Sequence, residues 1–193
     1  ELAQEAERVL GRAIETEYAL GGSVGDEAVA RGPATRASAA QQAMWHDTRR
    51  HPGVHVNHVA FDVYGPLDVS RVHAAAEQLA AAFPSLRTRF EARDGAVVRT
   101  VTDGIRGTVR YESLRPGDFD RRIQALGEAG LDPAYEVCAI SAFRIDPEHH
   151  IIVLSLHHVI YDAAWVIRLV QAWLDVLDTR PIVRLPTPFE RFV

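Results

Sequence analysis

Two apolar segments near the end of the chain constrain its fold more than any other feature of the sequence. Val137–Ile145 and Ile151–His157 have the length and apolar character of buried strands, and the polar segment Asp146–His150 joins them. Strands joined by so short a segment pair antiparallel. Apolar residues then recur at helical spacing over Ala163–Leu177, which predicts a helix with one face to bury. The pattern therefore predicts a hairpin whose sheet is covered by a helix.

The preceding part of the chain repeats this mixture of strands and helices. Ser38 is a candidate N-cap of one helix, and Asp68 or Ser70 is a candidate N-cap of a second, which Pro84 ends. Further elements are predicted as strands at Val54–Tyr64, Leu86–Glu91, Ala96–Val101 and Thr108–Leu114, a hairpin turn at Asp94–Gly95 and a helix at Phe119–Ala129. This order predicts an α+β fold, a sandwich of helices on a mixed, mostly antiparallel sheet.

The first 37 residues differ in pattern from the rest. Residues 1–20 place apolar side chains at helical spacing between Glu and Arg, which predicts an amphipathic helix that packs on its own domain or on a neighbouring one. Residues 25–37 are rich in Gly, Pro and Ala, which is typical of a linker. We therefore divide the chain into 1–37 and a compact unit, 38–193. The chain starts at Glu1 rather than Met, from which we expect that it was cut from a longer polypeptide or processed.

Composition excludes several classes of function. The net charge is −5 and no long basic run is present, which argues against a nucleic-acid partner. No apolar run approaches the roughly 18 residues that a membrane span needs, so we expect no membrane partner and a cytoplasmic location. Cys138 is the single cysteine and lies in a predicted strand, so we expect it in the core. One cysteine excludes an internal disulfide and a cysteine-based zinc site.

The candidate active site is the segment between the last predicted strand and the last predicted helix. Neighbouring side chains of an extended segment point to opposite faces, so one of His157 and His158 is a packing residue and the other the reagent. An imidazole titrates near neutral pH and can take a proton from an attacking amine or hydroxyl. Asp162 can cap the helix or hold an arginine. No metal is expected.

Two other polar pairs call for a different interpretation. His149 and His150 fall in the predicted polar turn, and we expect them to be solvated. Arg87 and Arg89 fall two residues apart in a predicted strand, and we expect both on one face of it.

Three stretches, taken together, resemble the condensation domains of nonribosomal peptide synthetases. The first, Ser38-x-Ala40-Gln41-x-x-Met44-Trp45, is similar to the family's first motif, with Ala43 where the family has Arg. The second comprises Asn57, Gly65, Leu67, Asp68 and Leu86–Phe90, and it has Phe83–Ser85 where the family has Arg-His-Glu. The third, His157-His158-x-x-x-Asp162, resembles the His-His-x-x-x-Asp-Gly signature, with Ala163 in the Gly position.

The resemblance spans residues 38–193 and implies the amino-terminal lobe of a domain with the chloramphenicol acetyltransferase-like fold. A whole domain of this family has two lobes with a tunnel between them. The isolated lobe is therefore expected to be inactive and to expose an apolar face where the carboxy-terminal lobe would sit.

The chemistry implied by the resemblance is amide formation in the biosynthesis of antibiotics and other secondary metabolites. An amine on one carrier domain attacks a thioester on another, and both substrates are held on 4'-phosphopantetheine arms, so the chain itself binds no cofactor. The resemblance makes His158 the residue that positions or deprotonates the amine and His157 a supporting residue. It makes Asp162 structural, with Arg87 as its most natural partner and Arg89 as the other candidate.

Ala163 is the departure from the family pattern that bears most on activity. A backbone N–H at the start of a helix can donate to a developing oxyanion, and Ala163 keeps this N–H but adds a methyl group. Two alternatives to an active condensation lobe remain open. One is a non-catalytic module that binds a carrier or another protein, and the other is an acyltransferase that uses coenzyme A.

Overall fold

A computed structural model describes residues 18–19, 32–104 and 108–177, and in this part of the chain the strands form two sheets. The larger has the order β1-β6-β7-β8-β3 and the smaller β2-β5-β4. The strands are β1 Tyr18–Ala19, β2 Thr35–Arg36, β3 Val56–Tyr64, β4 Thr88–Arg93, β5 Ala96–Val101, β6 Thr108–Ser113, β7 Cys138–Asp146 and β8 His149–His157. The helices are α2 Ala39–Thr48, α3 Val69–Ala82, α4 Phe119–Ala129 and α5 Ala163–Leu177, with 3₁₀ turns η1 Pro84–Arg87 and η2 His158–Ile160.

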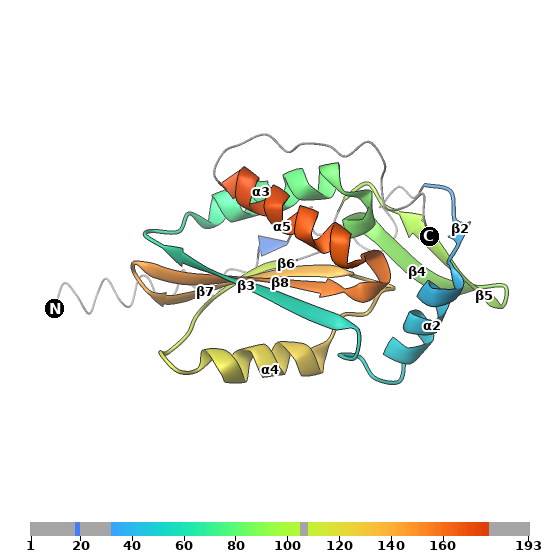
Figure 1. The fold of residues 1–193 in the computed structure, drawn as a ribbon, viewed down its shortest axis with the longest axis horizontal. Helices are drawn as coiled ribbons and strands as arrows, with labels where there is room; N and C mark the ends of the chain where they lie inside the picture. The colour runs from blue at the N-terminus through green and yellow to red at the C-terminus, as the bar shows by residue number, and fades with distance from the viewer. Residues whose placement is uncertain (1–17, 20–31, 105–107, 178–193) are drawn as a thin grey trace.

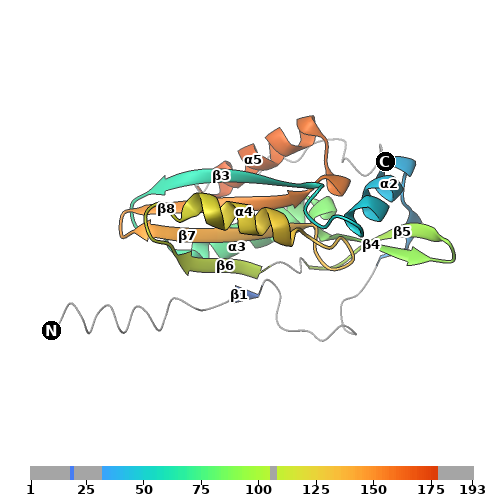
Figure 2. The same ribbon diagram turned by 90° about the horizontal axis from the view of Figure 1, so that it is seen from below.

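Helices cover both faces of the larger sheet. Figures 1 and 2 show α3 and α5 on one face and α4 on the other. β7 and β8 pair antiparallel, as their short connection predicts, whereas β6 and β7 pair parallel because α4 connects them. One parallel pair among antiparallel ones makes the sheet mixed, and the predicted α+β sandwich is confirmed.

The main core lies between the larger sheet and the pair α3 and α5. Alternate residues of β8 point into it, because side chains of a strand alternate between its two faces. Its central members are Val72, Ala76 and Leu79 of α3, Ile152, Leu154 and Leu156 of β8, and Trp165, Leu169 and Trp173 of α5. Cys138 is buried in the same core, as predicted, and burial raises the pKa of its thiol to about 12.

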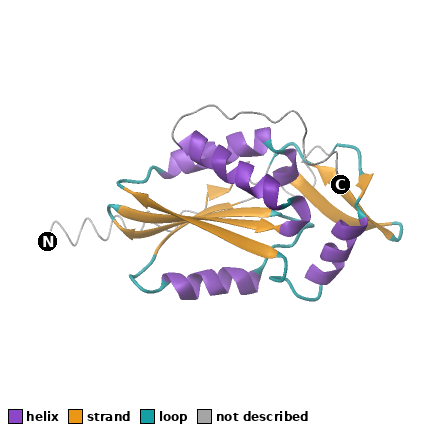
Figure 3. Ribbon diagram, in the orientation of Figure 1, coloured by secondary structure: helices purple, strands orange, loops and turns teal. Residues whose placement is uncertain are grey.

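The smaller sheet lies beside α2, at one end of the larger one (Figure 3). The Ser38 side chain accepts a hydrogen bond from the Gln41 N–H, and the Gln41 side chain accepts one from the Ser38 N–H, so Ser38 is the N-cap as predicted. Trp45 is buried and its indole N–H donates to the Phe90 carbonyl of β4, 3.3 Å away. Asp68 caps α3 by accepting from the Ser70 N–H at 2.9 Å.

Several sequence predictions of element boundaries are wrong. Tyr18–Ala19 pair with β6 and Thr35–Arg36 with β5, so the ends of the predicted helix and linker are strands, and the remainder of residues 1–31 lies outside the described residues. Pro84 begins a 3₁₀ turn, which leaves Arg87 outside the strand that carries Arg89. The two arginines therefore do not share a strand face.

The predicted solvated pair is also corrected. The turn between β7 and β8 consists of Pro147 and Glu148 only, so both histidines belong to β8. His150 is 3% exposed, and burial lowers its pKa. His149 is partly exposed, and its Nε2 lies 2.7 Å from the Asp62 carboxylate. No helix among the described residues is long and apolar enough to span a membrane.

Candidate active site at the end of strand β8

Backbone hydrogen bonds join the turn at the end of β8 to the residues that precede β7 and β3. The His157 N–H donates to the Val137 carbonyl at 2.9 Å, and the His158 N–H donates to the His55 carbonyl at 2.7 Å. The Gln41 side chain donates to the Val159 carbonyl at 3.1 Å, which ties the turn to α2 as well. The backbone around both histidines is therefore held from three directions.

His157 is the packing residue of the pair. It is fully buried, its Nδ1 accepts from the Val159 N–H at 3.1 Å, and its Nε2 lies 2.8 Å from the Thr48 hydroxyl. A backbone N–H can only donate, so Nδ1 carries no proton and the Nε2 proton is donated to Thr48, whose hydroxyl donates to the Met44 carbonyl. Burial, with smaller contributions from His55 and His158, lowers the pKa of His157 to about 4. This side chain is neutral near pH 7.

His158 has one nitrogen bound and one open. Its Nδ1 lies 3.0 Å from the Tyr161 carbonyl, and because a carbonyl only accepts, Nδ1 carries the proton. In the neutral ring Nε2 then has the lone pair, and no hydrogen-bond partner reaches it from residues 18–19, 32–104 or 108–177. The imidazole also stacks on the Tyr161 ring, with centroids 4.7 Å apart and planes at 15°. A half-buried histidine in this state is a proton acceptor.

Asp162 caps the helix that follows. Its carboxylate accepts from the Trp165 N–H at 2.7 Å, and its carbonyl accepts from the Val166 N–H. This is one of the two roles predicted for it. The predicted pairing with Arg87 is absent, because Arg87 donates instead to the Ala80 and Thr102 carbonyls. The Asp162 side chain is exposed and satisfied by the helix, so it needs no cation.

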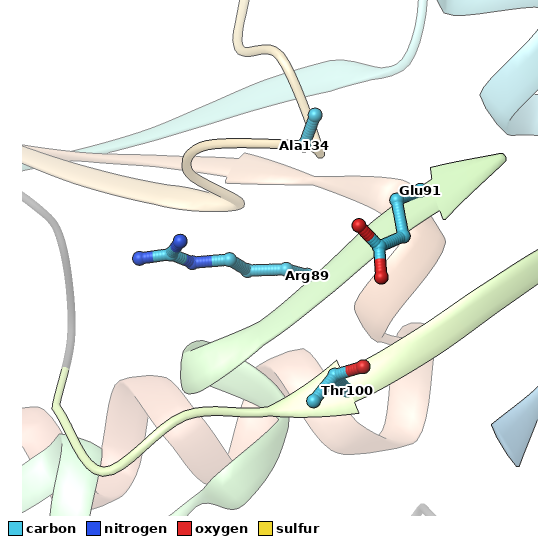
Figure 4. A pocket seen from close by; sticks show the side chains of 4 residues that line it. All are labelled: Arg89, Glu91, Thr100 and Ala134. Atoms are coloured by element: carbon cyan, nitrogen blue, oxygen red, sulfur yellow. The ribbon is translucent and has the colours of Figure 1, made fainter. Parts of the chain in front are cut away.

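Ala163 and Arg89 complete the set of predicted site residues. Ala163 is exposed and is the first residue of α5, where a backbone N–H has no partner within the helix. Arg89 lies elsewhere: with Glu91, Thr100 and Ala134 it lines a small hollow beside the smaller sheet (Figure 4). The site therefore brings together His157, His158, Asp162 and Ala163, but not the arginines.

Sequence analysis assigned no site role to three residues that contact the turn, although Asn57 belongs to the second motif. His55 supplies the carbonyl for His158, and its side chain pairs with Asp47 at 3.0 Å. Tyr161 contacts the His158 ring, and its phenol accepts a hydrogen bond from the Asn57 side chain. The alternation of β3 places Asn57 on the face that α5 covers, which was the available signal for it. No group of three or more acidic, Cys or His side chains among the described residues can hold a metal.

Comparison with known proteins yields a family model described as Condensation domain, which matches residues 34–177. Among curated relatives, nonribosomal peptide synthetase ftmPS of Neosartorya fischeri is 26% identical over 143 residues, which are 72% of this chain and 6% of that protein. Surfactin synthase subunit 1 of Bacillus subtilis strain 168 is 24% identical over 114 residues, which are 59% of this chain and 3% of that protein.

Solved structures show the same fold. The X-domain in complex with OxyB from teicoplanin biosynthesis has a TM-score of 0.71 and 22% identity, over 89% of this chain and 39% of that one. The starter condensation domain of rhizomide synthetase RzmA has a TM-score of 0.67 and 14% identity, over 83% of this chain and 44% of that one. The chain thus spans less than half the length of these structures.

Proposed function

The chain belongs to the condensation-domain family, and from that premise we propose that it supplies the histidine side of a site that forms amide bonds between carrier-bound thioesters in nonribosomal peptide biosynthesis. The observation that carries this proposal is the state of His158. Its Nδ1 proton is donated to the Tyr161 carbonyl, and its Nε2 has an open lone pair. An imidazole held in this way can accept a hydrogen bond or a proton from a substrate amine at Nε2.

The proposed reaction is an aminolysis. The acceptor amine attacks the carbonyl carbon of the donor thioester as His158 Nε2 accepts a proton from the amine nitrogen. The C–N bond forms, the C–S bond breaks, and the imidazolium returns its proton to the departing thiolate. An amine is a good nucleophile once it is neutral, so placement of two tethered substrates supplies much of the acceleration.

The neighbouring residues support His158. His157, fully buried and bonded through both ring nitrogens, holds the turn in shape and takes no part in proton transfer. Asp162 fixes the first turn of α5. The Ala163 N–H, at the start of that helix, is the proposed donor to the oxyanion that forms on the thioester carbonyl.

The proposed partners follow from the family and from the length of the chain. Donor and acceptor carrier domains would present their substrates on 4'-phosphopantetheine, and the carrier domains, not this chain, would hold that group. Because the chain spans 39% and 44% of two solved relatives, the remaining part of the domain is proposed as a carboxy-terminal lobe that completes the site.

A second candidate function is a protein-binding module without turnover. The teicoplanin X-domain, whose fold this chain shares, has been solved in complex with another protein, OxyB. All three motifs also depart from the family pattern, at Ala43, Phe83–Ser85 and Ala163. A module of this kind would bind its partner with His158 intact or replaced.

The test places the chain in its full domain together with both loaded carriers and follows dipeptidyl-thioester formation by mass spectrometry. We expect His158→Ala to lower the rate about 10²- to 10⁴-fold, the usual contribution of a general base. His149→Ala, a histidine at the other end of β8, is the matched control and should leave the rate unchanged. Free acyl-coenzyme A in place of the donor carrier tests the remaining alternative, an acyltransferase that uses coenzyme A. Intact carrier binding without product from the wild type would favour the binding module.

A further inference from the structure

Tyr161 makes more contacts with His158 than any carboxylate does. Its carbonyl accepts the Nδ1 proton at 3.0 Å, and its ring stacks on the imidazole at 4.7 Å. Tyr161 is 6% exposed, so these contacts lie inside the fold. A histidine base is commonly oriented by an acidic side chain, but here the nearby carboxylates are engaged elsewhere: Asp162 caps α5 and Asp47 pairs with His55.

The tyrosine is itself held on its far side. Its ring stacks on Trp165 with centroids 5.9 Å apart and planes at 18°, and the Phe83 ring meets Trp165 edge-on at 5.7 Å. Its phenol oxygen accepts a hydrogen bond from the Asn57 side chain, which lies on β3 opposite Leu156. The His158 imidazole therefore rests on an aromatic stack that is fixed both to the sheet and to α5.

We propose that Tyr161 is the positioning residue of His158 and that, clamped between Asn57 and Trp165, it keeps the imidazole in the Nδ1-protonated tautomer with Nε2 open. This inference rests on the proposed function only for its effect on rate. The tautomer with the proton on Nε2 would lose the bond to the Tyr161 carbonyl, which favours the Nδ1-protonated form by roughly tenfold. Rotation of the imidazole would break both that bond and the stack.

The first test reads the tautomer directly. The ¹⁵N chemical shifts of the His158 ring, recorded on the 193-residue chain with labelled histidine, distinguish protonated from unprotonated nitrogen. At a pH at which the ring is neutral, the wild type should show a protonated Nδ1 and an unprotonated Nε2. Tyr161→Leu keeps the carbonyl but removes the stack and the phenol that hold the imidazole against it, so His158 should become a mixture of tautomers. Tyr64→Leu removes another tyrosine that stacks on a histidine, His149 at 5.0 Å, and it should leave the His158 signals unchanged.

The second test measures the rate in the full domain with both carriers loaded. Tyr161→Leu should slow amide formation about 10- to 100-fold at unchanged carrier affinity, because the base remains but is misplaced. Tyr161→Phe and Asn57→Ala each remove the same hydrogen bond, the first by deleting its acceptor and the second by deleting its donor. Each should therefore slow the reaction by a similar factor, smaller than that of Tyr161→Leu. The double variant should be no slower than either single one.

The outcomes separate this inference from the proposed function. If the His158 tautomer and the rate of Tyr161→Leu both match the wild type, Tyr161 is not a positioning residue. If Tyr161→Leu does not fold, the Tyr161→Phe and Asn57→Ala pair decides, and additive effects in the double variant would overturn the clamp. If His158→Ala keeps full activity, the proposed function fails, whereas the tautomer measurement still tests the contact.

Discussion

Two histidine pairs lie at opposite ends of strand β8, and they differ in their hydrogen-bond partners. At each end one member is buried, His150 and His157, and the other is partly exposed, His149 and His158. Alternation along the chain explains this shared feature. The partners explain the difference, because a carboxylate occupies Nε2 of His149 whereas a backbone carbonyl binds Nδ1 of His158 and leaves its Nε2 open.

The comparison shows that partner atoms, and not exposure, distinguish a surface histidine from a candidate base. At the first end, His149 pairs with Asp62 and stacks on the exposed ring of Tyr64. At the second end the strand stops, a 3₁₀ turn begins, and carbonyl groups that would otherwise pair in the sheet become acceptors for side chains.

Replacing the two buried histidines, His150 and His157, should give the largest difference in the free energy of unfolding. His157→Leu would leave the Thr48 hydroxyl and the Val159 N–H without their ring partners, so we expect it to lower the free energy of unfolding by about 3–4 kcal/mol. His150→Leu removes one backbone hydrogen bond, to Gly65, and a buried Nδ1 that has no partner, so it should cost less, about 1 kcal/mol. Urea unfolding measures both, and equal losses would remove the distinction between the two buried histidines.

The loops next to the two ends should differ in their tolerance of a methyl group. A Cβ at Gly53, near the residue whose carbonyl holds His158, would lie 2.0 Å from the Gly127 carbonyl oxygen of α4, so Gly53→Ala should cost about 2–3 kcal/mol. Gly65, whose N–H donates to Glu148 at the other end, has φ +99 but open space, so Gly65→Ala should cost about 1 kcal/mol. Thermal unfolding ranks the two, and the reverse order would contradict the close packing at Gly53.

Acid should lower the free energy of unfolding mainly by protonating His157, at the second end of β8. The pKa of His157 falls from 6.5 to about 4 in the fold, so the unfolded chain binds this proton first. The stability that the neutral ring provides is complete above pH 6.5 and is lost as the pH falls from 6.5 towards 4, with a loss of about 2 kcal/mol by pH 5. Urea titrations at several pH values measure this slope, and His157→Leu should remove the share of His157 and leave the smaller share of His150, whose pKa burial also lowers. An unchanged slope in the variant would place the titration elsewhere.

The smallest effect is expected for the ion pair at the first end. Asp62→Asn removes the carboxylate from an exposed pair whose side chains are 27% (His149) and 57% (Asp62) exposed, so the free energy of unfolding should change by less than about 1 kcal/mol. Amide formation should not change. A large loss of activity in this variant would mean that both ends of β8 contribute to the site.

Most secondary structure could be predicted because local patterns determine it. The bounds of Phe119–Ala129 and Ala163–Leu177 follow from apolar periodicity and are confirmed. The prediction is wrong at Leu86–Arg87, where a proline-initiated turn replaces the start of a strand, and at His149–His150, where a two-residue turn lets the strand begin earlier. Both errors concern element ends, which depend on which neighbour completes the hydrogen-bond ladder.

The sequence by itself determined the family, the order of the elements and the position of the histidine turn, because motif spacing and hydrophobic periodicity are properties of the chain alone. Only the tertiary structure decided which atoms those histidines bind. The partners of His157 and His158 include Thr48 and His55, which are about a hundred residues away in the sequence, and the Asn57 that holds Tyr161 is equally distant. The protonation state of a ring nitrogen depends on the atom that it faces, and packing brings that atom to it.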